Sequence, residues 1–232
     1  MYFPGFFYDE TYILILIGVV ISLIASSGVN RAFTKYSRVR NSRGITGAEA
    51  AEMEANMLID LMTTAGENLK GTPWTVYPRP QMKRDSFLNL NGIWDFSVGN
   101  TEFDQAIRVP FCPESDLSGV GYKDFINGVW YQKKVTLNEA QCAGTVFLHF
   151  GAVDYEAIVY VNGKKVGTHK GGYVSFKFDI TAFVTPGENV ITLNAIDDSR
   201  QGLIPSGKQS ERPYSFGCFY TRTTGIWQTV WL

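Results

Sequence analysis

Two hydrophobic patterns divide the chain. From Thr11 to Asn30 no residue is charged, and Tyr12 to Ala25 is apolar almost throughout. Twenty helical residues span about 30 Å, the thickness of a bilayer core, so this stretch predicts one transmembrane helix over about 11–30. A buried helix of a soluble domain is the alternative. After Arg84 the pattern changes to short stretches in which apolar and polar residues alternate, which predicts β-strands.

The charges around the apolar stretch predict its orientation. Asp9 and Glu10 precede it, whereas a cleavable signal peptide needs a basic start. Basic residues follow it, beginning at Arg31 and Lys35. By the positive-inside rule the rest of the chain then faces the cytoplasm, anchored by this single helix. If the N-terminal segment is an artefact, the protein is simply cytoplasmic.

The residues around this helix resemble a known family. The strings Val29-Asn-Arg-Ala-Phe-Thr-Lys-Tyr-Ser-Arg-Val-Arg40 and Gly44-Ile-Thr-Gly-Ala-Glu-Ala-Ala51 are similar to the start of bacterial membrane-bound neutral zinc metallopeptidases. The resemblance covers about residues 1–53, which we interpret as a membrane-anchor segment with a basic juxtamembrane stretch. The sequence contains no His-Glu-x-x-His, so no zinc ligand can be assigned.

Residues 54–80 differ from both neighbouring parts. Glu54 to Leu69 has the apolar spacing of a short amphipathic helix, and a Pro-rich lead-in follows. The seam near residue 53 is either a true gene fusion or a misjoined or truncated reading frame. The second interpretation is favoured because both halves resemble proteins whose catalytic parts lie further along.

Residues 81–232 predict an all-β sandwich. Strands are expected near residues 93–98, 129–137, 145–150, 157–161, 164–167, 174–179, 190–196 and 227–232. Asn162-Gly163 lies between two of them and is a strong signal for a tight hairpin. Many short strands with no helices between them are typical of a sandwich or jelly roll.

This region resembles the sugar-binding domain of family 2 glycoside hydrolases, the β-galactosidases and β-glucuronidases, over about 58–232. The telling strings include Asp85-Ser-Phe-Leu-Asn-Leu-Asn-Gly-Ile-Trp-Asp-Phe96, Val161-Asn-Gly163, Gly207-Lys-Gln209 and Thr223-Thr-Gly-Ile-Trp-Gln-Thr-Val-Trp231. The resemblance implies a galactose-binding-domain-like jelly roll. It also implies two partners, namely a β-linked sugar of the galactoside or glucuronide class and the catalytic TIM barrel of the parent enzyme.

The same resemblance implies that this chain is non-catalytic. Glycoside hydrolysis uses two carboxylates, which this family places on the barrel, and a barrel takes about 250 residues. The sequence ends at Leu232, where the sandwich should end, so no catalytic residue is assigned. Asn138-Glu139 resembles the acid/base dipeptide of the family, but its position after a strand predicts a surface turn.

Composition narrows the remaining possibilities. A net charge of −1 gives no basic field for nucleic acid. Three scattered cysteines and two histidines indicate neither a disulfide framework nor a metal site, and no cofactor is expected.

One loop carries the candidate sugar contacts. Amides and charged groups match the donors and acceptors of sugar hydroxyls, and the candidates are Asp197, Asp198, Arg200, Lys208 and Gln209. A solvated or interdomain loop is the alternative. A second candidate is an aromatic platform built from Phe125, Asn127, Trp130 and Tyr131, for which core packing is the favoured interpretation.

Overall fold

The computed structural model describes residues 19, 26–27, 63–79, 81–82 and 84–232. The predicted membrane span at 11–30 and most of the predicted helix at 54–69 lie outside these residues. Within the described residues no helix is long and apolar enough to cross a membrane. The chain divides into two units, Met1–Ile59 and Asp60–Leu232. The helices and strands named below belong to the second unit.

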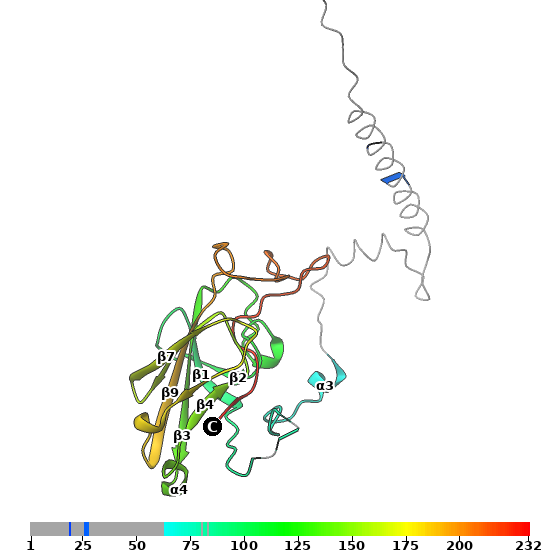
Figure 1. Cartoon of the computed structure of the whole chain (residues 1–232). Coiled ribbons are helices and arrows are strands. Elements are labelled where there is room, and N and C mark those ends of the chain that lie inside the picture. The colour runs from blue at the N-terminus through cyan, green and yellow to red at the C-terminus, as the bar shows by residue number, and fades with distance from the viewer. Residues whose placement is uncertain (1–18, 20–25, 28–62, 80, 83) are drawn as a thin grey trace, which may run out of the picture. The chain divides into compact units, whose positions relative to one another are not determined.

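The second unit is built from short strands in chain order (Figure 1). Its elements are α3 (Thr64–Glu67), β1 (Gly92–Val98), β2 (Gln105–Val109), η1 (Asp116–Ser118), β3 (Gly128–Leu137), α4 (Glu139–Cys142), β4 (Phe147–Phe150), β5 (Val153–Asp154), β6 (Glu156–Val161), β7 (Lys164–Lys170), β8 (Phe176–Asp179), η2 (Thr181–Phe183), β9 (Gly187–Ile196), β10 (Gly225–Ile226) and β11 (Val230–Trp231).

The strands form a sandwich. A six-stranded antiparallel sheet has the order β2-β1-β3-β9-β6-β7, and a three-stranded sheet has the order β11-β4-β8. A small pair, β10 and β5, completes the described strands. The predicted all-β architecture is therefore confirmed.

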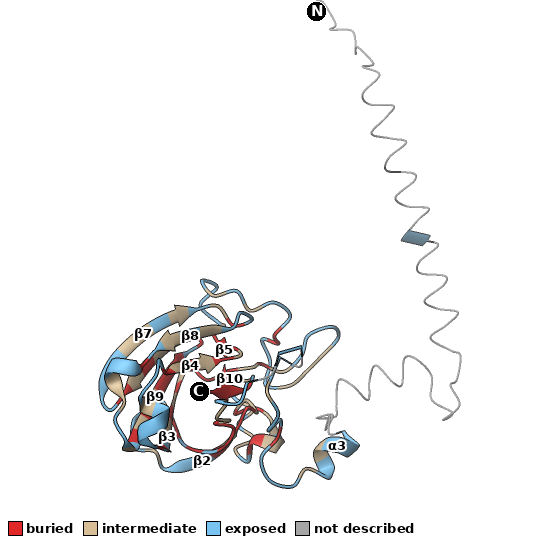
Figure 2. Cartoon of the chain, turned by 60° about the horizontal axis from the view of Figure 1, so that its bottom comes forward, coloured by how far each residue is buried: buried red, intermediate tan, exposed pale blue. Residues whose placement is uncertain are grey.

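Alternation along the strands builds the core. In β6, Ala157, Val159 and Val161 are buried while the residues between them are half-buried. The same pattern along β3 buries Val129 and Tyr131. Figure 2 shows buried residues in red along the strands of the sandwich. Removing this apolar surface from water is the main force that holds the two sheets together.

The predicted hairpin at Asn162-Gly163 is present. It joins β6 to β7, and both turn residues have positive φ, 50° and 77°. Asn162 tolerates this conformation because its side-chain amide donates to the Asn189 Oδ1 and the Phe183 carbonyl.

Several expected boundaries were wrong. Of the strand predicted over 227–232 only β11 (Val230–Trp231) is present, and β10 lies before it at Gly225–Ile226 and belongs to another sheet. The strand predicted from Val190 starts earlier, at Gly187, where it pairs with Leu137 on β3.

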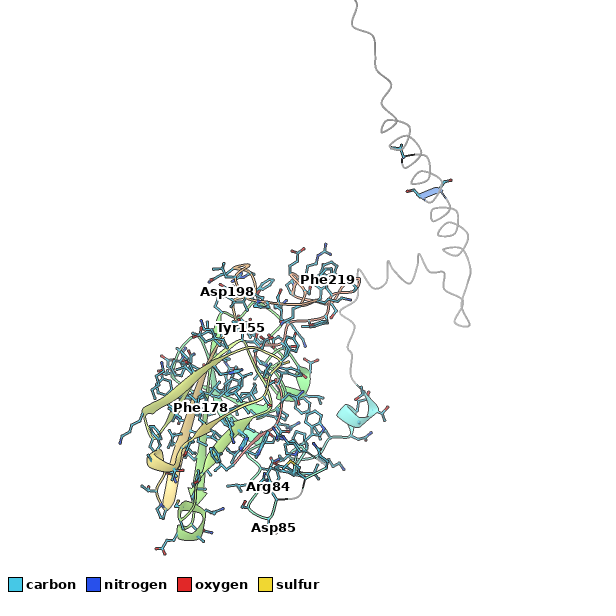
Figure 3. The ribbon with its side chains drawn as sticks, viewed as in Figure 1. Arg84, Asp85, Tyr155, Phe178, Asp198 and Phe219 are labelled. Carbon is cyan, nitrogen blue, oxygen red and sulfur yellow. The ribbon has the colours of Figure 1, made fainter. Side chains whose placement is uncertain are left out.

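The long segment between β9 and β10, residues 197–224, is called the long loop below. It lies at the end of the sandwich where β9 finishes and β3 begins, which we call the loop end. Figure 3 places Asp198, Tyr155 and Phe219 at this end and Arg84 and Asp85 at the opposite end.

Candidate functional site

The five predicted sugar contacts all lie in the long loop, but in two different environments. Arg200 and Lys208 are exposed and Asp198 is half-buried. Asp197 is 3% exposed and Gln209 is 7% exposed, so both are inside the domain. The loop therefore has a polar outer surface and a polar inner attachment.

The outer surface is organised around Arg200. Its guanidinium donates to Asn127 Oδ1 at 3.0 Å, and its Nε lies 3.7 Å from Asp198 Oδ1. The same guanidinium lies over the Phe125 ring, 4.7 Å from the centroid. Gln201 donates to the other Asp198 oxygen at 2.8 Å. This arrangement offers carboxylate, amide and guanidinium groups on one surface, the donor and acceptor types that hydroxyl groups bind.

The inner attachment contains three buried acidic residues, called here the carboxyl cluster: Glu114, Asp154 and Asp197. Each is at most 3% exposed. They come from the segment after β2, from β5 and from the residue after β9. Buried carboxylates are normally paired with a cation, yet the ion pairs among the described residues include none of the three.

Side chains and backbone of the long loop bind this cluster. Gln209 Nε2 donates to Asp154 Oδ2 at 2.9 Å. Thr224 bridges the other two acids: its backbone N–H donates to Glu114 Oε2 at 3.2 Å and its hydroxyl to Asp197 Oδ2 at 3.3 Å. Glu114 Oε1 and Asp154 Oδ1 are buried without a hydrogen-bond partner. The cluster therefore holds both ends of the loop against the sandwich.

Burial changes the protonation of these acids. Desolvation, assisted by repulsion from Asp154 and Glu114, raises the pKa of Asp197 to about 7. Desolvation also raises the pKa of Asp154 to about 6 and the pKa of Glu114 above its usual value. Removing water from a carboxylate disfavours the charged form, so these groups hold their protons to higher pH than exposed carboxyl groups do.

Arg222 is the buried cation nearest to this region, and it binds carbonyl groups. Its guanidinium donates to the backbone oxygens of Ser210, Arg212, Lys123 and Asp124. It also stacks over Phe125, 4.3 Å from the ring centroid. These bonds give Arg222 a structural role in holding the long loop to residues 123–124.

The candidate aromatic platform is not one surface. Tyr131 is fully buried, and its hydroxyl accepts from the Ile226 N–H at 3.3 Å. Trp130 points to the opposite face of the sheet and stacks on Tyr160 across β9. Phe125 and Asn127 instead surround Arg200. Successive strand residues face opposite ways, so Trp130 and Tyr131 cannot share a face.

Other apolar side chains are exposed near this end. Tyr173 and Tyr220 are joined by a 3.1 Å hydroxyl contact, and Tyr173 packs edge-on against Trp227. Phe219 and Leu203 in the long loop are also exposed, Leu203 to 84%. An exposed apolar group of this kind is typical of an interaction surface.

Sequence reasoning missed Glu114 and Asp154, which lie far from the long loop in sequence. A usable signal was present for Asp154, because an acidic residue between the apolar Val153 and an aromatic Tyr155 is unusual in a short buried strand. Among the described residues no group of three or more His, Cys, Asp or Glu side chains is arranged to hold a metal ion. The dipeptide Asn138-Glu139, which resembles the acid/base dipeptide of the family, lies in a surface helical turn. Asn138 caps α4, and Glu139 is exposed.

Two protein-family models match parts of the chain. Residues 121–209 match the model described as glycosyl hydrolases family 2, sugar binding domain. Residues 11–64 match the model described as putative neutral zinc metallopeptidase. Both resemblances predicted from the sequence are thus confirmed.

Individual relatives of the chain are named as β-galactosidases and β-glucuronidases. A β-galactosidase of Thermoanaerobacter pseudethanolicus is 36% identical over 150 residues, which cover 62% of this chain and 19% of the relative. A β-glucuronidase of Canis lupus familiaris is 34% identical over 168 residues, covering 63% of this chain and 24% of the relative. The chain therefore spans about a fifth to a quarter of these enzymes.

A solved structure has the same fold. A β-glucuronidase from Ruminococcus gnavus superposes with a TM-score of 0.51 at 19% identity, covering 70% of this chain and 31% of that chain. The likeness concerns the β-sandwich alone.

Proposed function

We propose that the sandwich of this chain is a non-catalytic sugar-recognition and scaffold domain of a family 2 exo-β-glycosidase. The observation that carries the proposal is the polar surface around Arg200 on a domain whose residues 121–209 match the family's sugar-binding model. The relatives are named as β-galactosidases and β-glucuronidases, so the ligand is a β-linked galactoside or glucuronide.

The proposed contacts are Asp198, Arg200 and Lys208. All three have side chains reachable from solvent at the loop end. Asp197 and Gln209 instead fasten the loop, because their polar atoms are occupied inside the domain. The exposed Tyr173, Tyr220 and Leu203 form the surface on which the catalytic barrel of the parent enzyme packs.

Calorimetry with methyl β-galactoside and methyl β-glucuronide tests this proposal. We expect saturable binding by the purified chain in the millimolar range, and an Arg200→Ala variant that loses about tenfold in affinity, equivalent to about 1.4 kcal/mol. Arg84→Ala is the matched control, because Arg84 is an exposed arginine at the opposite end of the sandwich (Figure 3). Equal affinity in both variants, or no heat with either sugar, rejects the proposed site.

Hydrolysis is tested separately. The three most buried acids are sealed in the carboxyl cluster and cannot reach a glycosidic bond, so the chain should not turn over nitrophenyl β-galactoside or β-glucuronide. Turnover that survives purification to homogeneity would contradict a purely binding role.

A membrane-tethered binding protein is the second candidate. The uncharged stretch from Thr11 to Asn30 and the match of residues 11–64 to a metallopeptidase start favour it. We propose an anchor in which the sandwich faces the cytoplasm. Carbonate extraction of membranes should leave the full chain in the pellet, and protease added to intact cells should leave the sandwich uncut; release of the chain by carbonate argues for an artefactual N-terminus.

A further inference from the structure

The long loop is fastened to the sandwich in part through the carboxyl cluster. The backbone contacts of its distal part lie within the loop, for example Ser210 N–H to the Tyr220 carbonyl at 2.7 Å and Tyr220 N–H to the Lys208 carbonyl at 3.0 Å. Through the cluster, Gln209 binds Asp154 and Thr224 binds Glu114, while a further bond from Thr224 to Asp197 joins the two ends of the loop. The other links to the sandwich are Arg222 to the 123–124 carbonyls, Arg200 and the Asp197 N–H to Asn127, and Tyr220 to Tyr173. Three of these bonds end on carboxyl oxygens.

Those carboxyl oxygens are bound in a way that does not require a negative charge. Gln209 and Thr224 are neutral donors, and a neutral carboxylic acid accepts such bonds through its carbonyl oxygen. No cation is bonded to any of the three acids, and two of their oxygens have no partner at all. An unpaired carboxylate in a site without water is far more costly than a neutral acid.

The titratable groups beside the cluster come from several segments packed against it. Asp198, next to Asp197, is acidic, whereas the Cys112 thiol and the phenols of Tyr131 and Tyr173 have raised pKa values and stay neutral between pH 5 and pH 8. On the basic side is Arg222, whose bonded N–H groups are all directed at carbonyls. Every further proton lost from the cluster therefore adds negative charge to a region that already repels it.

We propose that Glu114, Asp154 and Asp197 form a proton-dependent latch: while the acids are neutral the long loop is held on the sandwich, and as they ionise with rising pH the loop is released. Release follows because Gln209 and Thr224, the loop residues bonded to these carboxyl oxygens, must move away before water can replace them there. The latch thus converts proton loss inside the domain into exposure of the segment that carries Arg200 and Lys208.

The raised pKa values of two of the acids set the pH range in which we expect the latch to open. The pKa of Asp154 is about 6 and that of Asp197 about 7. Both lie above the ordinary value of an aspartate, so the acids are neutral below pH 5 and ionised above pH 8. Opening is expected between these limits.

Hydrogen–deuterium exchange of the full chain without any sugar tests the latch. The amides of Thr224 and Asp197, which are bonded to Glu114 and to the Asn127 carbonyl, report its attachment, and the Leu193 amide in β9 reports the core. After correction for intrinsic exchange, we expect protection of the loop amides to fall at least about tenfold from pH 5 to pH 8, since each pKa unit is a factor of ten. Protection at Leu193 should fall much less.

Asp197→Asn removes one ionisable member of the latch while keeping the oxygen that Thr224 binds. This variant should keep more loop protection at pH 8 than the native chain. Asp104→Asn is the matched control, since Asp104 is exposed, and it should behave as the native chain. Loop protection in the native chain that is equal at pH 5 and pH 8, or that falls as steeply in Asp197→Asn, overturns the latch. The outcome does not depend on sugar binding, so the two proposals can fail separately.

Discussion

At the residue scale, the neighbours Asp197 and Asp198 are placed by strand alternation. In β9, Ile191, Leu193 and Ala195 are buried, and Asp197 continues this inward series while Asp198 turns outward. Two identical side chains in adjacent positions therefore differ in burial and in hydrogen-bond partners. The sequence predicted both as sugar contacts, and its alternation contained the information that separates their environments.

Gly225 shows how tightly the cluster region is packed. Its φ is +72°, and a Cβ built there would lie 2.3 Å from the Tyr131 hydroxyl oxygen. Gly99 has the same φ, with no atom within 4 Å. Substitutions at these two glycines therefore allow the cost of backbone strain to be measured apart from the cost of steric overlap.

We expect Gly99→Ala to lower the free energy of unfolding by about 1–2 kcal/mol, the cost of a left-handed conformation for a residue with a Cβ. Gly225→Ala should lower it by about 3 kcal/mol or more, because the fully buried Tyr131 must also move. Urea unfolding of both variants measures the difference, and equal losses would show that Tyr131 adapts freely.

At the element scale, sequence reasoning succeeded for most strands that are long enough to show a period, although it missed the five-residue strand β2. The strands β1, β3, β6 and β9 each have several alternating residues and were predicted near their true positions. The two-residue strands β5 and β10 have no measurable period. These strands exist because residues 153–154 pair with residues 225–226. The two segments are far apart in the sequence, so no local sequence pattern predicts the pairing. The acidic residues that cluster beside them were missed for the same reason.

The helical turn α4 is an element whose stability depends on one cap. Asn138 accepts from the Gln141 N–H at 2.8 Å, and the Gln141 side chain accepts from the Asn138 N–H at 2.9 Å. Asn138→Ala should therefore lower the free energy of unfolding by about 1 kcal/mol. Glu139→Gln, at the exposed neighbouring position, should change it by less than about 0.5 kcal/mol. Thermal or urea unfolding compares them; a larger loss for Glu139→Gln would contradict the capping role.

At the scale of the whole molecule, buried titratable groups set the pH dependence of stability. Asp154, Asp197 and Glu114 have raised pKa values, so their contribution is fully present at acidic pH and is lost as pH rises. For Asp154 and Asp197 the loss begins near the ordinary aspartate pKa of about 4 and is complete above about 6 and 7. His149, stacked on Trp231, has its pKa lowered to about 4 by desolvation and nearby cations. Its contribution acts in the opposite direction, declining as pH falls from about 6.5 towards 4. Three buried acids outweigh one half-exposed histidine.

The free energy of unfolding should therefore be higher at pH 5 than at pH 8. Urea unfolding at the two pH values measures it, with the same buffer ions and ionic strength. Replacing both Asp154 and Asp197 by Asn should flatten the curve over this range. A native chain that is most stable at pH 8 would show that the acids are ionised at no cost.

The contact between Asn91 and Val230 has a consequence for how the protein is made. The Val230 N–H donates to Asn91 Oδ1 at 3.0 Å across 139 positions of sequence, and Leu88 and Leu232 exchange backbone hydrogen bonds beside it. During synthesis the first segment of the sandwich leaves the ribosome long before its partner exists. Contacts this distant in sequence slow folding, and the apolar edge formed by the first residues of the sandwich stays unpaired until the last strand has been made. Newly made chains should thus depend on chaperones until translation has passed the final strand.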